Sequence, residues 1–172
     1  MRTFILYIAM CFCLCFVFKG QAQQNSKEKN FDIESFEGKT KEKLQFLVYG
    51  MSPKLLFDNS MNPIYIWNED KEIESVEIIG AKQFKILLDS NFKADYKNVK
   101  SLVLRLNTGE KLELTEKDFI LFDNLEFLVI QFDEEATLKQ IIDKFQELQL
   151  SGKFKQVELL IERIYKMDSY EE

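Results

Sequence analysis

The side chains of this sequence that could support catalysis are mainly carboxylates. Glu69 and Asp70 are adjacent. A second acidic group consists of Asp133, Glu134 and Glu135. Two carboxylates that flank a glycosidic bond can hydrolyse it. Adjacent acids are more typical of solvated turns and helix N-termini, because ionised carboxylates favour water and the positive end of a helix dipole. A small envelope hydrolase with paired carboxylates is therefore kept as an alternative, and no catalytic residue is assigned.

Other catalytic and metal chemistry lacks its usual residues. The chain has no histidine, and its three cysteines are Cys11, Cys13 and Cys15, all within one apolar stretch. Nucleophilic dyads that use histidine cannot form, and the usual ligands of a zinc site are missing. No glycine-rich phosphate-binding loop occurs in the sequence. We expect no metal site, no cofactor and no enzymatic activity.

Two aromatic residues could bind sugar. Tyr65 and Trp67 follow Pro63 closely, and their rings could stack on a sugar ring, so a carbohydrate-binding module is a further alternative. The favoured interpretation is that both belong to the core of a strand over residues 64–67, because large aromatic side chains are buried on average.

The N-terminus has the layout of a secretory signal peptide. Arg2 gives a positive start, and residues 4–18 form an uncharged apolar run. Gly20 and Ala22 then supply the small residues that precede a cleavage site. The apolar run is shorter than the stretch of about 20 residues that spans a bilayer. We expect residues 1–22 to be removed, leaving no stable membrane anchor and an exported protein, periplasmic or secreted.

The charge balance argues against nucleic acid as a partner. The full chain has 23 Lys and Arg against 29 Asp and Glu. Removing residues 1–22, which hold Arg2 and Lys19, leaves 21 basic against 29 acidic residues, a net charge of −8. Phosphate backbones are bound by clustered basic residues, which are absent from this sequence. The rest of the chain has no cysteine, so burial alone must stabilise it, as a domain of this size allows.

The first part of the exported chain is expected to be a leader and a cap. Residues 23–43 are polar and are predicted to be a partly disordered leader. Apolar residues alternate over 44–49, which predicts a strand. Ser52 and Pro53 could cap and begin a short helix. We expect a single domain over residues 44–172, in which residues 44–69 form a β-rich N-terminal cap.

The second half of the sequence repeats itself. Residues 96–106 align with residues 122–132 at a spacing of 26, with aromatic on aromatic, Asn on Asn and apolar on apolar positions. A similar copy precedes them at 73–78, and a fourth follows at 154–161, where a spacing of 32 aligns Val157 with Leu125. Each copy is a short run rich in Val, Leu and Ile, which predicts a strand. The connections are long enough to make these strands parallel.

At this point the chain resembles a leucine-rich repeat family over about residues 70–166. That family repeats the pattern L-x-x-L-x-L-x-x-N/C. Its apolar positions are filled here by Ile73, Val76 and Ile78, by Val99, Leu102 and Leu104, and by Leu125, Leu128 and Ile130. The terminal asparagine occurs once, as Asn107; Ala81 and Asp133 replace it elsewhere, and Glu162 falls on the third apolar position of the fourth copy. The resemblance implies parallel strands on one side, helices or turns on the other, and a protein-binding role.

Helical spacing is found in two of the connections. The stronger pattern predicts a helix through Leu138, Ile141, Ile142, Phe145 and Leu148. The acids at 133–135 would favour its N-terminus and Gly152 its C-terminus. A weaker pattern comprises Phe84, Leu87 and Leu88. We predict an α/β fold: a short leucine-rich-repeat-like stack over residues 70–172, with parallel strands and irregular or helical crossovers.

One face of the predicted strands is more apolar than an open solenoid requires. Leu102, Leu104 and Leu106 share one side of a strand, and alternate residues point to the other. That second face either lies under another part of the chain, such as the N-terminal strands and residues 52–62, or forms an exposed groove for a partner. The function we predict is an exported, non-enzymatic module that binds another protein through this face. Its candidate binding residues are Val103, Arg105, Phe127, Val129, Gln131 and Ile161.

Overall fold

A computed structural model describes residues 31–58, 60, 62–67, 71–133, 137–149 and 152–164 of the chain. The predicted signal peptide and the first part of the predicted leader lie outside these residues. So do Glu69, Asp70, Glu134 and Glu135.

The strands form a single six-stranded sheet. They are β1 (Lys54–Phe57), β2 (Pro63–Ile66), β3 (Ser75–Ile79), β4 (Ser101–Arg105), β5 (Phe127–Phe132) and β6 (Glu158–Arg163). Their order in the sheet is β2-β1-β3-β4-β5-β6. All neighbours are parallel except β1 and β2, which form an antiparallel pair at one edge. The α/β class and the parallel strands are therefore confirmed.

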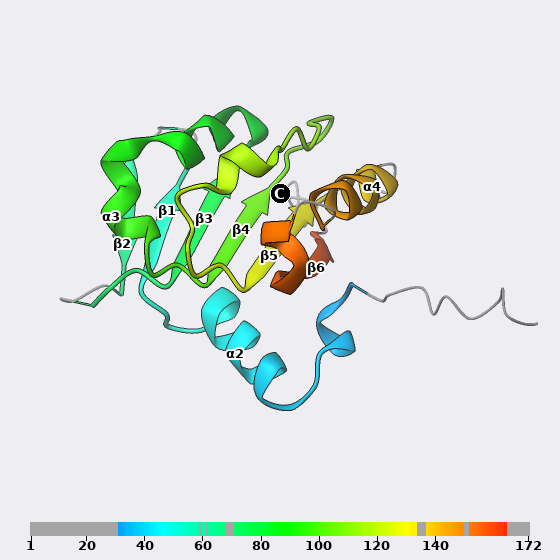
Figure 1. The fold of residues 1–172 in the computed structure, drawn as a ribbon, viewed down its shortest axis with the longest axis horizontal. Helices are drawn as coiled ribbons and strands as arrows, with labels where there is room; N and C mark the ends of the chain where they lie inside the picture. Colours follow the sequence, from blue (N-terminus) through cyan, green and yellow to red (C-terminus); the bar gives the residue numbers. More distant parts are fainter. Residues whose placement is uncertain are drawn as a thin grey trace, which may run out of the picture. The chain divides into compact units, whose positions relative to one another are not determined.

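The helical segments join the strands or precede them (Figure 1). The α-helices are α2 (Gly38–Tyr49), α3 (Lys93–Tyr96) and α4 (Thr137–Gln149). The 3₁₀ segments are η1 (Ile33–Ser35), η2 (Ala81–Leu88), η3 (Ser90–Phe92), η4 (Glu116–Phe119) and η5 (Gly152–Gln156). The helix predicted around residues 138–148 is confirmed as α4. The weaker pattern at Phe84 and Leu87 forms η2 rather than an α-helix, and Gly152 begins η5.

The sheet register follows the sequence repeat. Val76 pairs with Leu102, and Leu102 with Leu128, so equivalent strand positions keep the predicted spacing of 26. The fourth copy differs, because Leu128 pairs with Leu159 and Ile130 with Ile161, a spacing of 31. The predicted spacing of 32 was wrong. A shift of one residue exchanges the two faces of a strand, so Ile161 lies on the opposite face from the one predicted.

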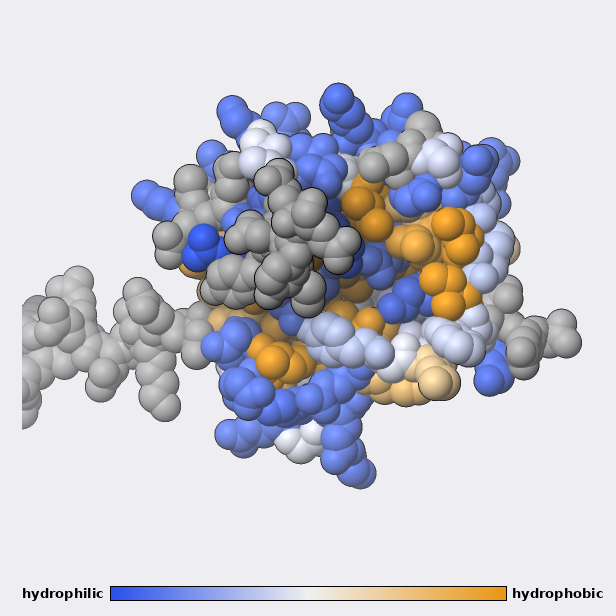
Figure 2. Space-filling view, turned by 180° about the vertical axis from the view of Figure 1, so that it is seen from behind, coloured by the Kyte–Doolittle hydropathy of each residue, from blue (hydrophilic) through white to orange (hydrophobic). Residues whose placement is uncertain are grey.

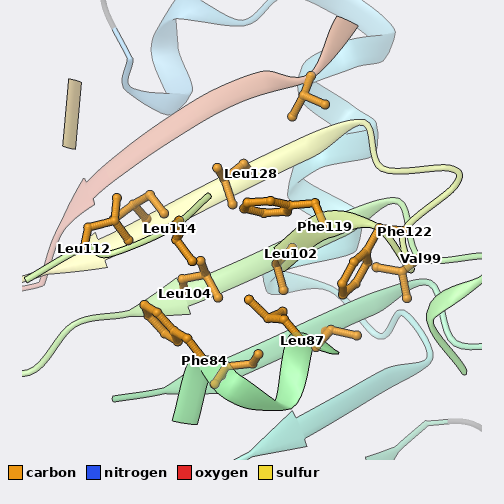
Figure 3. Packing of buried hydrophobic residues seen from close by; sticks show 14 of the residues in the cluster. Phe84, Leu87, Val99, Leu102, Leu104, Leu112, Leu114, Phe119, Phe122 and Leu128 are labelled. Atoms are coloured by element: carbon orange, nitrogen blue, oxygen red, sulfur yellow. The ribbon is translucent and has the colours of Figure 1, made fainter. Parts of the chain in front are cut away.

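The main core lies between the sheet and its crossovers. Figure 3 shows Leu102, Leu104 and Leu128 pointing from β4 and β5 toward Phe84, Leu87 and Phe119 of the crossovers. The repeated aromatics Tyr96 and Phe122 stack with ring centroids 4.6 Å apart. The Tyr96 hydroxyl donates to the Ile86 carbonyl at 3.1 Å, and burial raises the pKa of Tyr96 far above its usual range. Equivalent positions of the repeat thus build one continuous core.

The segment predicted as a strand at 44–49 is instead the second half of α2. Leu44, Leu47 and Val48 are buried, whereas Phe46 is exposed. Burial therefore follows the helical spacing i, i+3, i+4 rather than the alternation of a strand. Ser52 and Pro53 do not begin a helix; they precede β1, and the Ser52 hydroxyl donates to the Leu47 carbonyl near the end of α2 at 2.9 Å. The predicted β-rich cap thus contains a helix as well as β1 and β2.

The chain before α2 crosses the edge of the sheet at β6. The Phe31 carbonyl accepts the Ile161 N–H at 2.6 Å, and the Phe31 side chain packs against the main core. Ile33 and Phe36 pack against a second apolar cluster, which includes Leu44 and Leu47 of α2. In Figure 1, α2 lies on one side of the sheet and the crossovers lie on the other. Residues 31–49 therefore form a strap that passes from one face to the other.

Candidate functional site

Three of the six predicted partner-binding residues are covered by α2. Val103, Phe127 and Val129 are buried and pack, together with Leu160, against Leu44, Leu47 and Val48 of α2. Gln131 is also buried, and Ile161 belongs to the main core on the opposite face. The structure therefore has a covered face at these positions and not an exposed groove. The covering contacts come from residues 44–49, the segment predicted as an N-terminal strand, which is helical in α2; residues 52–62 do not form the cover.

Polar contacts hold α2 against the sheet. The Lys54 ammonium donates to the Val48 carbonyl at 2.9 Å, where the end of a helix carries partial negative charge. In the middle of the helix, Lys43 donates to Glu126 Oε1 at 2.7 Å. The ring of Phe36 meets Phe127 edge to face, with centroids 6.5 Å apart. The cover is thus attached along its length, from β5 to β1.

The same sheet face is open at β2, β1 and β3. Leu56 pairs with Ile64 and Lys54 with Ile66, which places both isoleucines and Leu56 on the face that carries Glu77 and Val103. Ile79 shares that face on β3. Ile64 is 41% exposed, and the other three are partly exposed. We call Leu56, Ile64, Ile66 and Ile79 the open half-face.

Figure 2 shows the side of the molecule opposite to that in Figure 1. Hydrophobic side chains gather there on the right, with hydrophilic ones between them. The turn about the vertical axis brings β1 and β2, on the left in Figure 1, to this half of the view. This half of the view therefore shows a mixed surface of apolar and hydrophilic groups.

A chain of polar contacts crosses the sheet from β1 to β6. We call it the polar ladder; its members are Lys54, Glu77, Arg105, Gln131 and Glu162. Lys54 lies 3.9 Å from Glu77, and Arg105 Nη2 lies 3.0 Å from Glu77 Oε1. Arg105 Nε donates to Gln131 Oε1 at 3.1 Å, and Gln131 Nε2 donates to Glu162 Oε2 at 3.0 Å. Burial raises the pKa of Glu162.

The polar ladder unites two of the predicted site residues, Arg105 and Gln131. The Arg105 side chain is 38% exposed, so it is the ladder cation that a partner can reach most easily. Lys54 and Gln131 are buried. Lys54 and Glu162 were not predicted, because the sequence did not reveal the register of β1 and β6. Glu77 pairs with Val103 at the predicted spacing of 26, so the repeat could have revealed it.

The polar ladder does not have the geometry of a glycosidase pair. Glu77 on β3 and Glu162 on β6 are three strand spacings apart, about 14 Å between backbones. Paired catalytic carboxylates lie about 5–9.5 Å apart. Of the acids predicted as candidates, Asp133 is described, and it accepts a hydrogen bond from the Thr108 hydroxyl. Within the described residues, no group of three or more potential ligands is placed to hold a metal ion.

Tyr65 and Trp67 are not core residues. Tyr65 is 45% exposed and Trp67 is 55% exposed, so the prediction of buried aromatics was wrong. The Tyr65 hydroxyl donates to Asp95 Oδ2 at 3.3 Å. Trp67 has a φ of 57°, in the left-handed region that few large residues adopt. The strand β2 ends at Ile66, one residue before Trp67. The strand predicted over residues 64–67 therefore does not extend to Trp67, and its indole is not held in the core.

A groove of about 840 Å³ lies where the chain enters the parallel strands. We call it the amino-edge groove. Phe46 and Met51 belong to its lining, together with Glu74, Lys100 and Glu126. These last three residues each immediately precede a strand and occupy equivalent positions of the sequence repeat. The repeat could have revealed them, but the prediction used only its apolar, aromatic and asparagine positions.

The comparisons with known proteins give no relative to guide the interpretation. No helix in the described part of the chain is long and apolar enough to cross a membrane. The surfaces described above are therefore the basis for a functional proposal. No family model matches the chain, and no curated protein or solved structure is significantly similar to it.

Proposed function

We propose that the protein is an exported, non-enzymatic module that binds another protein through the open half-face. One observation carries this proposal: Leu56, Ile64, Ile66 and Ile79 stay partly exposed on a sheet face whose other half is covered by the chain's own helix. Contiguous exposed apolar surface commonly marks an interaction site in soluble proteins. The proposal moves the binding surface from β4–β6 to β2, β1 and β3.

The groups around the open half-face suit a protein partner. Arg105 contacts Glu77 beside it and remains partly exposed. Tyr65 and Trp67 are exposed in and just after β2. Arginine, tyrosine and tryptophan are the residue types that contribute most often to binding hot spots. An apolar centre with Arg105 at its margin has the composition expected of a protein interface. Tyr65 pairs with Leu55 and contacts Asp95, so it lies on the opposite face and marks the sheet edge rather than the open half-face.

We further propose that the sheet is a short leucine-rich-repeat-like stack, closed at one end by β1 and β2. The order β1-β3-β4-β5-β6 follows the sequence, and the strands run parallel. The constant spacing from β3 to β4 and from β4 to β5 supports this interpretation. Solenoids of this type bind partners through extended repeat surfaces. Asn107, the residue that best fitted the family pattern, is exposed, and its backbone N–H donates to Glu110 at 2.8 Å.

A charge substitution within the open half-face tests the binding proposal. The exported chain, residues 23–172, would be used to recover a partner by cross-linking from its native envelope. Ile64→Glu should reduce recovery at least about tenfold, equivalent to ~1.4 kcal/mol. Ile120→Glu is the matched control, because Ile120 is 63% exposed at the end of η4, outside the open half-face.

The melting temperature of both variants shows whether the fold is intact. A partner that Ile64→Glu loses and Ile120→Glu keeps supports the proposed surface. A partner that the folded Ile64→Glu variant recovers as well as the wild type does contradicts it.

The exposure of Tyr65 and Trp67 favours carbohydrate binding as a second candidate function. A sugar that stacks on the indole should alter its fluorescence, and Trp67→Phe should keep part of the affinity while Trp67→Ala loses it. A glycan array without signal for the wild-type protein would remove this candidate.

Export is proposed from the sequence of residues 1–22 alone. Cell fractionation followed by N-terminal sequencing should find the protein outside the cytoplasm with Gln23 as its first residue. A cytoplasmic protein that retains Met1 would contradict this part of the proposal.

A further inference from the structure

We propose that the amino-edge groove binds an extended cationic peptide segment that also carries an apolar side chain. This site is separate from the open half-face. The groove lies along the entry ends of β3, β4 and β5, and the end of α2 forms one side of it. Its size, its charges and its apolar wall all support the same class of ligand.

The apolar wall comes from α2 and the residues after it. Phe46 is 47% exposed and Met51 is 71% exposed, and both line the groove with Pro53. An aromatic face attracts a cation as well as apolar groups, and methionine adapts its shape to different ligands. Phe46 does not belong to the cluster of buried residues through which α2 packs on the sheet. Its exposed ring is therefore available to a ligand.

The opposite wall is acidic. Four carboxylates line the groove, those of Glu72, Glu74, Asp123 and Glu126, against two lysines, Lys71 and Lys100. The ionised lining therefore has a net charge of −2. This charge complements a cationic ligand, and the negative net charge of the whole chain, −6, adds to the attraction.

Ion pairs fix part of this wall and leave two acids exposed. Lys100 pairs with Glu74, and Lys43 of α2 pairs with Glu126. Glu72 and Asp123 are exposed at the two ends of the wall, before β3 and before β5. The two ion pairs thus hold the loops in place, while the exposed carboxylates are accessible to a ligand.

The distance between the two ends defines the ligand further. Two strand spacings separate β3 from β5, about 10 Å. A polyproline II chain brings residues i and i+3 to the same side, about 9 Å apart. Two basic residues separated by two others could therefore reach both acidic ends, with an apolar residue between them directed to Phe46 and Met51. Asn98 lines the groove between these ends and can bond to a peptide backbone. Asn124, at the equivalent position beside Asp123, donates through Nδ2 to the Lys97 carbonyl at 2.8 Å and keeps its amide oxygen as an acceptor.

The test measures the binding of a defined peptide to the exported chain, residues 23–172. The probe is a fluorescein-labelled hexapeptide with two arginines separated by a leucine and an alanine, and binding is followed by fluorescence anisotropy at low ionic strength. The comparison peptide has glutamate in place of both arginines. We expect saturable binding of the arginine peptide and none of the glutamate peptide.

Two double variants separate the groove from general charge attraction. Glu72→Lys with Asp123→Lys should weaken binding at least about tenfold, because it reverses both acidic ends of the groove. Glu113→Lys with Asp143→Lys changes the net charge equally at two exposed sites outside the groove. This control should weaken binding less than about threefold, because separated surface charges are screened by salt.

The apolar wall has its own variant. Phe46→Ser should weaken binding about tenfold or more, and Ile120→Ser, a matched exposed site, should not. Equal weakening by the two double variants would overturn the proposal. So would equal binding of the glutamate peptide, or no saturation of the arginine peptide below about 1 mM. Ile64→Glu should leave peptide binding unchanged, so failure of the groove and failure of the open half-face can be distinguished.

Discussion

The two halves of one sheet face have similar strands but different surroundings. On β4, β5 and β6, apolar residues such as Val103, Val129 and Leu160 lie under α2 and are fully or nearly fully buried. On β2, β1 and β3, the equivalent row carries Ile64, Leu56 and Glu77, which remain partly or largely exposed. The residue types alone do not distinguish a core position from a surface one; the extent of the cover does.

The length and attachment of the strap explain where the cover ends. The strap crosses the sheet edge at β6, and α2 then has 12 residues. A helix of that length spans about 18 Å, or nearly four strand spacings of about 4.8 Å. Ser52 and Lys54 contact the end of the helix as the chain enters β1. The helix therefore reaches across β6, β5 and β4 and ends where the open half-face begins.

The largest contrast between the halves should come from placing one charge in each. Val129→Glu puts a carboxylate in a position with no exposed surface, and we expect a loss of about 3–5 kcal/mol in the free energy of unfolding. Ile64→Glu should change it by less than about 1 kcal/mol, because its side chain can extend into water. Urea denaturation measures both. Similar losses for the two variants would break the distinction between covered and open halves.

A second contrast uses two neighbouring residues of α2. Leu47 is buried against the sheet and Phe46 is exposed. Leu47→Ala should cost about 2–4 kcal/mol, because it leaves a cavity under the helix. Phe46→Ala should cost less than about 1 kcal/mol. A greater loss from Phe46→Ala than from Leu47→Ala in the same denaturation assay would show that the helix packs through its other side.

The elements predicted correctly are those on which two constraints agreed. The positions of β3, β4 and β5 followed from apolar runs that also recur at a constant interval, and the structure pairs them in that register. Parallel pairing followed from the length of the connections. The helix α4 was found because five apolar residues share one helical stripe.

The elements predicted wrongly are short apolar runs that fit two structures. Leu44, Phe46 and Val48 alternate like a strand, while Leu44, Leu47 and Val48 are spaced like a helix. Residues 159–161 are all apolar, so the fourth copy could be aligned in either of two adjacent registers. Only tertiary packing decides between such alternatives, because each places apolar groups on a plausible face.

The candidate sites show the same limit. Arg105 and Gln131 were found because they lie on the predicted strand face, but their partners Lys54 and Glu162 required the true register of β1 and β6. The amino-edge groove needs α2 as a wall, and the segment was predicted to be a strand. Its repeated charges before β3, β4 and β5 were visible in the sequence and could have been followed.

A smaller effect is expected where the two halves meet. Lys54 donates to the last turn of α2 and lies beside Glu77. Lys54→Met keeps an apolar stem of similar length but removes the donor, and should cost about 1–2 kcal/mol. Lys71→Met is the control, because Lys71 is exposed. Hydrogen exchange should show faster opening of α2 in the first variant only; unchanged exchange in both would mean that the ammonium group does not fasten the helix.

The smallest effect tests whether the far end of the polar ladder is desolvated. Burial raises the pKa of Glu162, so over the range between its unfolded and folded pKa values the folded state binds more protons than the unfolded state. The stability that this group contributes is then present below its unfolded pKa, about 4.3, and is lost as the pH rises through its folded pKa. Glu162→Gln should be more stable than the wild type at pH values near 7, by less than about 1 kcal/mol, because the site is only partly buried.

That advantage should disappear under acid conditions, where the wild-type side chain is itself neutral. The amide oxygen of the glutamine can still accept the hydrogen bond that Gln131 donates to Glu162, so the comparison isolates the charge. Urea midpoints at neutral pH and below about pH 4 measure the difference, with Glu113→Gln at an exposed position as the control. An advantage of equal size at both pH values would mean that the charge of Glu162 is not the cause. It would place this end of the polar ladder with the solvated half of the face instead of the covered one.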